Sequence, residues 1–291
     1  HGTQADLTHG FYVVAFRRAA TSTLAQAASL PERGYLLVFR GTLFTNTSLP
    51  LEHDTLEPWD SQGCQGCEIH AGYHARWSSM RSSVFAQLND IGCKQGDPIL
   101  VTGHSEGAAL ATLAMASLRI LGRYNVLLSY TFGAPRVGND QFAAFFDSLF
   151  GRHVSVFRVT HGNDVYPRMP RRSAGFANVG YQVWYPDAAS GDYVICGGAR
   201  ADPTCGNDGI PFECTVPPSV DGPHCQFPLA PAITQHGFCI QGALGGRVVD
   251  AADLQIQADM ACARWFKGSE VPITIAVPTP NRWVADVVRS E

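Results

Sequence analysis

Short apolar runs alternate with helical patterns along the first two thirds of the chain. Six runs rich in aliphatic and aromatic residues are typical of buried strands, at 35–41, 99–103, 126–133, 154–161, 181–186 and 192–198. Apolar positions recur at helical spacing over 72–92, 110–118 and 140–151. Strands that alternate with helices predict a mostly parallel central sheet covered by helices, an α/β fold.

The remainder of the chain carries weaker patterns. Residues 199–235 are rich in Pro, Gly, Asp and Cys and are expected to form loops stapled by disulfides. Residues 240–291 show a helical pattern and then a strand-like one, and we assign this extension no role. No apolar run approaches the roughly 18 residues of a membrane-spanning helix. We expect residues 1–291 to form one domain.

Charge and cysteine content narrow the class of protein. The formal net charge of −4 argues against a nucleic-acid partner. The nine cysteines lie mainly in loops, which favours disulfides in a secreted protein. Cys64 and Cys67 lack a second C-x-x-C pair, so we expect no metal and no cofactor. Asn46-Thr47-Ser48 is an N-glycosylation sequon, which is consistent with a glycoprotein.

The segment ILVTGHSEGAALATLAMASL, residues 99–118, passes from a strand pattern to a helix pattern within five residues. The turn between them, Gly103-His104-Ser105-Glu106-Gly107, is a G-x-S-x-G sequence, typical of a nucleophile elbow. A serine before a helix is also a common N-cap, and this alternative stays open at this point. A catalytic interpretation requires an acid and a histidine further along the chain.

A candidate acid follows the strand predicted at 154–161. The segment FRVTHGNDVYPRMP places Asp164 in a turn just after that strand. Catalytic groups of open α/β sheets gather at the carboxyl ends of strands. A serine followed by an aspartate and then a histidine is the α/β-hydrolase order.

Five ordered segments resemble the secreted fungal class 3 lipases and their feruloyl esterase relatives. They are VFRGT, CQGCEIHAGYHARW, VTGHSEGAALATL, YTFGAPRVGN and FRVTHGNDVYPRMP, and the resemblance covers about residues 35–227. It implies a secreted serine carboxylic-ester hydrolase of the lipase or esterase type, with the α/β-hydrolase fold. The substrates would be acylglycerols or feruloyl-type plant-wall esters, and we expect a monomer with transient contact to a lipid interface.

The resemblance also implies roles for individual residues. Ser105 would be the nucleophile and Asp164 the acid of a Ser-Asp-His triad. Thr42 and the backbone N–H of Glu106 would form the oxyanion hole. The alternative is a catalytically silent lipase-like protein that binds lipid or another protein. An acyl ester assay separates these two hypotheses.

Two histidines after Asp164 are candidates for the base. His224 lies in SVDGPHCQF, which is similar to the family's histidine segment, and we favour it. Pro223 and Cys225 form a stiff setting for a moving imidazole, so His236 remains the alternative.

The sequence departs from the family at Glu106 and in the stretch after FRGT. Position 106 is usually apolar in the family, and we expect the Glu106 carboxylate to face solvent or a cation rather than the oxyanion. The stretch after FRGT, where lipases often carry an amphipathic helix, is polar and resembles a fixed esterase loop.

For the cysteines we predict four disulfides, with Cys93 left free: Cys64–Cys67, Cys196–Cys205, Cys214–Cys225 and Cys239–Cys262.

Overall fold

The computed structural model describes residues 3–6, 10–17, 33–41, 54–59, 63–127, 129–150, 156–162, 164, 166–186 and 193–196. Nine strands of this part form one sheet: β1 (Thr3–Asp6), β2 (Phe11–Arg17), β3 (Arg33–Phe39), β6 (Pro98–His104), β7 (Asn125–Val126), β8 (Ser129–Phe132), β9 (Val156–His161), β10 (Tyr181–Tyr185) and β11 (Val194–Cys196). The α-helices are α1 (Ala71–Asp90), α2 (Glu106–Ile120) and α3 (Asp140–Phe150), and two short 3-10 helices are η2 (Tyr166–Arg168) and η3 (Arg172–Ala174). Strands β4 (Leu56–Pro58) and β5 (Glu68–His70) form a separate pair.

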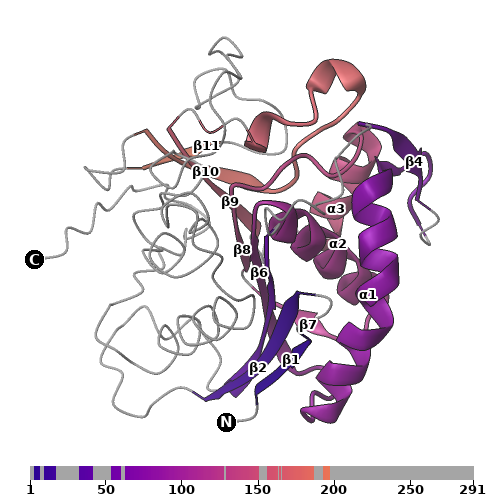
Figure 1. Ribbon diagram of the computed structural model, residues 1–291, viewed down its shortest axis with the longest axis vertical. Helices are drawn as coiled ribbons and strands as arrows, with labels where there is room; N and C mark the ends of the chain where they lie inside the picture. Colours follow the sequence, from indigo (N-terminus) through magenta and orange to yellow (C-terminus); the bar gives the residue numbers. More distant parts are fainter. Residues whose placement is uncertain are drawn as a thin grey trace, which may run out of the picture.

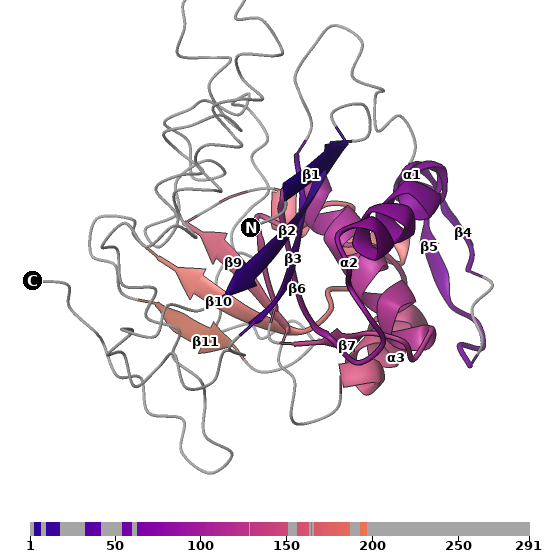
Figure 2. The same ribbon diagram turned by 90° about the horizontal axis from the view of Figure 1, so that it is seen from below.

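The central strands are parallel, as the alternation of strands and helices predicts. The sheet order is β1-β2-β3-β6-β8-β9-β10-β11, and β7 pairs with β6. Strands β3, β6, β8, β9 and β10 run parallel, whereas β1, β2 and β11 are antiparallel additions at the two ends. All three described α-helices lie on one face of this sheet in both views (Figures 1 and 2). The prediction of a mostly parallel sheet with packed helices is confirmed.

The antiparallel hairpin of β1 and β2 was not among the expected strands. Phe11 of β2 pairs with Phe39 of β3, and Phe11, Tyr12 and Val13 are all buried. An apolar run this short fits a strand or a buried helical segment equally well, so periodicity alone does not decide between them. Pairing with β3 stabilises residues 11–17 as a strand, because β3 pairs with β6 on one side and with β2 on the other.

Both faces of the parallel strands are buried. Along β3, Leu37 and Phe39 join the core beneath the helices, whereas Leu36 and Val38 belong to a cluster with Tyr12. This alternation reflects the two-residue period of a strand. A sheet with two buried faces needs apolar residues at successive positions, which explains the continuous aliphatic runs of the sequence.

The alanine-rich composition of α2 follows from its position. Every residue from Gly107 to Leu118 is buried, because the helix packs against β6 and also against α1. Small side chains permit this close packing on several sides of one helix. At the α1 contact, the Trp77 indole N–H donates a hydrogen bond of 3.0 Å to the Ser117 hydroxyl. Within the described residues no helix combines the length and apolar character needed to cross a bilayer.

Candidate active site

Ser105 lies at the turn between β6 and α2, as the nucleophile-elbow pattern predicts. Its backbone has φ 56° and ψ −128°, and among the described residues it is the only non-glycine residue with positive φ. The Ser105 N–H donates to the Phe132 carbonyl at 2.9 Å, which fixes the turn to the end of β8. The side chain caps no amide of α2, so the alternative of a simple N-cap does not describe this serine. A strained backbone held by its surroundings is typical of functional sites.

The two glycines of the elbow leave space for backbone rather than for side chains. A Cβ atom on Gly103 would lie 2.3 Å from the Gly107 carbonyl oxygen. A Cβ atom on Gly107 would lie 2.3 Å from the Phe39 carbonyl oxygen and 2.5 Å from that of Arg40. The G-x-S-x-G spacing therefore permits β6, α2 and the end of β3 to meet at van der Waals distance.

The segment after β3 lies directly beside the serine. A Cβ atom on Gly41 would be 3.4 Å from the Ser105 Cβ and 3.0 Å from the His104 carbonyl oxygen. The Arg40 N–H donates to the Gly10 carbonyl at 2.9 Å, which ties this segment to the start of β2. Thr42, the predicted oxyanion-hole residue, follows Gly41 and lies outside the described residues.

Asp164 follows the carboxyl end of β9, at the same edge of the sheet as Ser105. Strands β6 and β9 both pair with β8, so only one strand separates the two turns. The Asp164 side chain is buried, with 1% of its surface exposed. Its Oδ1 accepts the Tyr166 N–H at 3.0 Å, and its own N–H donates to the His161 carbonyl at 3.0 Å. These bonds fix the carboxylate in a tight turn.

Arg136 of the YTFGAPRVGN segment anchors the loop that carries Asp164. Its guanidinium donates to the carbonyls of Arg168 and Pro170, the latter at 2.9 Å, and its N–H donates to Met169 at 2.7 Å. The side chain is buried, with 3% exposed. In the sequence this segment is notable only for its family resemblance. A single sequence carries no signal that an arginine will hold three carbonyl groups of a later loop.

The Glu106 carboxylate forms an ion pair with Arg76 of α1. The distance between Glu106 Oε1 and Arg76 Nη1 is 3.1 Å, and 12% of the Glu106 side chain is exposed. We expected either a solvent-facing carboxylate or one beside a cation, and the structure has the second arrangement. The sequence does not predict this ion pair, because the pattern around Arg76 is typical of a solvent-exposed helix position.

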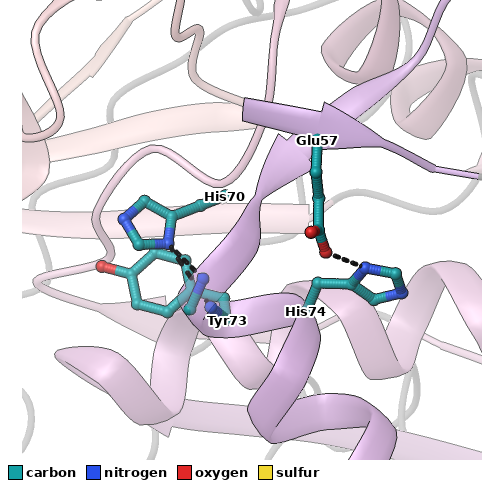
Figure 3. A network of polar contacts seen from close by, with 5 residues as sticks. Glu57, His70, Tyr73 and His74 are labelled. Atoms are coloured by element: carbon teal, nitrogen blue, oxygen red, sulfur yellow. Dashed lines mark hydrogen bonds and ion pairs between the residues drawn. The ribbon is translucent and has the colours of Figure 1, made fainter. Parts of the chain in front are cut away.

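A cluster at the start of α1 contains His70, Tyr73, His74 and Glu57 (Figure 3). His70 Nδ1 accepts the N–H groups of Gly72 and Tyr73 at 3.1 and 3.4 Å, so this histidine is the N-cap of α1. Its ring stacks on Tyr73 with 4.3 Å between centroids, and burial lowers its pKa. His74 Nδ1 forms a hydrogen bond with the Glu57 carboxylate beside it. This geometry agrees with a structural role for His70.

The described cysteines agree with the predicted scheme. Cys64 and Cys67 form a disulfide, and Cys93 is free and buried, with its pKa raised to about 12 by burial and the nearby Asp97. Cys196 is disulfide-bonded as well, while its predicted partner lies outside the described residues. The pairs Cys214–Cys225 and Cys239–Cys262 also fall outside them and stay predictions.

Several other predicted features lie outside the described residues. They include both candidate bases, His224 and His236, the sequon at Asn46, and the extension at 240–291. Of the polar stretch at 43–60, residues 54–59 are described, and they contain β4. The structure therefore places Ser105 and Asp164 at one edge of the sheet but does not test the complete triad.

A parallel sheet with a serine on a strained strand-to-helix turn defines the α/β-hydrolase class. Residues 36–174 match the sequence model of the family described as Lipase (class 3). This match places residues 36–174 in the class 3 lipase family.

Curated relatives and solved structures agree with this assignment. The chain is 38% identical to secreted mono- and diacylglycerol lipase 1 of Fusarium solani over 41% of this chain and 34% of the relative. It is 30% identical to secreted mono- and diacylglycerol lipase 2 of Gibberella zeae over 70% of this chain and 52% of the relative. It thus spans about a third and about half of these relatives. Lipase II from Rhizopus niveus has 26% identity and a TM-score of 0.54, covering 72% of this chain and 75% of that structure.

Proposed function

We propose that this protein is a secreted serine carboxylic-ester hydrolase that cleaves acylglycerols. The observation that carries the proposal is Ser105, held at φ 56° on the turn from β6 into α2. Such a turn exposes the hydroxyl to a substrate and directs the first amides of the helix toward the same place. The relatives named as secreted mono- and diacylglycerol lipases support the substrate class and the extracellular location.

The proposed mechanism proceeds through an acyl-enzyme. The Ser105 oxygen bonds to the ester carbonyl carbon while its proton passes to the histidine, for which we propose His224. Asp164 orients the imidazole and stabilises its charged form. The Glu106 N–H and Thr42 donate to the oxyanion of the tetrahedral intermediate, each worth about 3–4 kcal/mol at most. Collapse of that intermediate breaks the bond to the alcohol, which leaves with the histidine's proton, and water then releases the acid.

Two observations agree with these roles. Asp164 is buried and fixed by hydrogen bonds at the end of β9, while Ser105 follows β6 two strands away. Gly41, the residue before Thr42 in the sequence, lies beside Ser105, which supports the choice of Thr42 as an oxyanion donor. The order of nucleophile and acid along the chain, Ser105 before Asp164, agrees with the α/β-hydrolase arrangement.

The test is hydrolysis of p-nitrophenyl esters from acetate to palmitate, of a monoacylglycerol, and of methyl ferulate. We expect turnover of acyl esters and of the monoacylglycerol, and a loss of about 10³–10⁶-fold in Ser105→Ala. Preference for methyl ferulate over all acyl esters would move the substrate to plant-wall esters. Absence of turnover in the wild-type protein, with lipid binding retained, would instead support the silent lipase-like alternative.

A further inference from the structure

Glu106 carries a carboxylate on the residue that follows the proposed nucleophile. It is the first residue of α2 and directly follows Ser105, and its own backbone N–H is one of the two proposed oxyanion donors. Its side chain is largely buried, with 12% exposed. A negative charge in a poorly hydrated position beside a developing negative charge opposes the reaction. The site therefore requires something that compensates this carboxylate.

Arg76 of α1 meets that requirement. Its Nη1 lies 3.1 Å from Glu106 Oε1, and the Arg76 side chain is 39% exposed, so the pair lies at the border of the buried region. The Glu106 carboxylate also interacts electrostatically with Arg40 and Tyr73. Burial lowers the pKa of Arg40, and the carboxylate counteracts that lowering. Burial raises the pKa of Tyr73, and the carboxylate raises it further. Arg76 contacts the carboxylate directly, as an ion pair.

The α1 backbone at Arg76 is fixed by the residue that follows it. The next residue, Trp77, is 2% exposed and donates from its indole N–H to the Ser117 hydroxyl of α2. The Trp77 ring also packs edge-on against Phe39, the last residue of β3, with 6.1 Å between centroids. One turn of α1 is thereby attached both to α2 and to the strand that leads to the proposed oxyanion loop. The Arg76 guanidinium reaches Glu106 from a fixed backbone.

We propose that Arg76 is a positioning residue that neutralises the Glu106 carboxylate and turns it away from the oxyanion. This inference rests on the proposed function, because it concerns the same reacting centre. An uncompensated carboxylate destabilises the charged transition state more than the neutral bound ester. Its effect therefore falls on kcat and leaves KM nearly unchanged.

The experiment compares Arg76→Gln, Arg76→Lys, Glu106→Gln and the double variant Arg76→Gln with Glu106→Gln, using p-nitrophenyl butyrate. We expect Arg76→Gln to lower kcat at least tenfold, about 1.4 kcal/mol, with KM within threefold of wild type. Arg76→Lys keeps the charge and should recover most of the rate. The double variant should return to within threefold of Glu106→Gln, because no carboxylate then remains to be neutralised.

The matched control is Arg81→Gln, which removes an exposed arginine of the same helix that lies over the Phe85 ring. Its kcat should equal that of wild type. An unchanged kcat in Arg76→Gln, or a loss that persists in the double variant, overturns the inference. Ser105→Ala measured on the same substrate separates the two claims. If Ser105→Ala abolishes turnover while Arg76→Gln has no effect, only the role of Arg76 is wrong.

Discussion

Substitution of Gly107 by alanine tests how closely the elbow packs against the end of β3. The new Cβ atom would lie 2.3 Å from the Phe39 carbonyl oxygen and within 2.6 Å of two Arg40 backbone atoms. Contacts below 3.0 Å are not tolerated, so the backbones must separate by about 0.7 Å. Neither neighbour is a flexible side chain that can rotate away.

Two opposing energies decide the outcome. Alanine is a better helix former than glycine by about 1 kcal/mol, which would stabilise α2. Overpacking of a closed contact costs about 1–3 kcal/mol, and a backbone neighbour places this site toward the upper end. We therefore expect a net loss of about 2 kcal/mol in the free energy of unfolding. A displacement approaching 1 Å between Gly41 and Ser105 should also reduce kcat by about 10²-fold.

The assay is urea unfolding together with p-nitrophenyl butyrate hydrolysis. Gly122→Ala is the control, since Gly122 follows the other end of α2, has φ +60° and would place its Cβ with nothing within 4 Å. This control should lose about 1 kcal/mol from its positive φ and keep the wild-type kcat. A Gly107→Ala protein with wild-type stability and a kcat within threefold of wild type would refute the close packing of elbow and strand.

Two other predictions concern histidines. His224→Ala should lose about 10³-fold or more in kcat and His236→Ala only a small factor, and the reverse pattern in the ester assay would move the base to His236. Burial lowers the pKa of His70 from its ordinary 6.5, so its contribution to stability is complete above pH 6.5 and is lost as the pH falls through the lowered folded value. The test compares wild type with His70→Asn, which retains a capping side chain, by urea unfolding at pH 7.5 and 5.5. Over this range wild type should lose up to about 1.4 kcal/mol more of its free energy of unfolding than the variant does. Equal losses in the two proteins would contradict this prediction.

Much of the fold could be predicted because its elements have strong local signals. The aliphatic runs of β6 and β9 and the helical pattern of α1 each specify an element without help from distant residues. The hairpin of β1 and β2 was missed, since its conformation depends on pairing with β3. A short apolar segment of this kind gains its structure from its partner strand rather than from its own pattern.

The candidate site shows the same division. The positions of Ser105 and Asp164 could be predicted, because the G-x-S-x-G spacing and the turn after β9 are visible in short stretches of sequence. Arg136 and the contact between Arg76 and Glu106 could not, because each joins elements far apart in the sequence. Such contacts depend on how helices and loops pack, and residue type alone does not reveal which charged groups meet.

The central claim is that Ser105 is the nucleophile of an ester hydrolase, and covalent labelling tests it most directly. Wild-type protein is incubated with a fluorophosphonate ester, and the adduct is located by peptide mass spectrometry. We predict a single adduct on the peptide that contains Ser105, with loss of ester hydrolysis in proportion to labelling, and no adduct in Ser105→Ala. Labelling of Ser105→Ala to the same extent as wild type, with hydrolysis retained, would contradict the assignment.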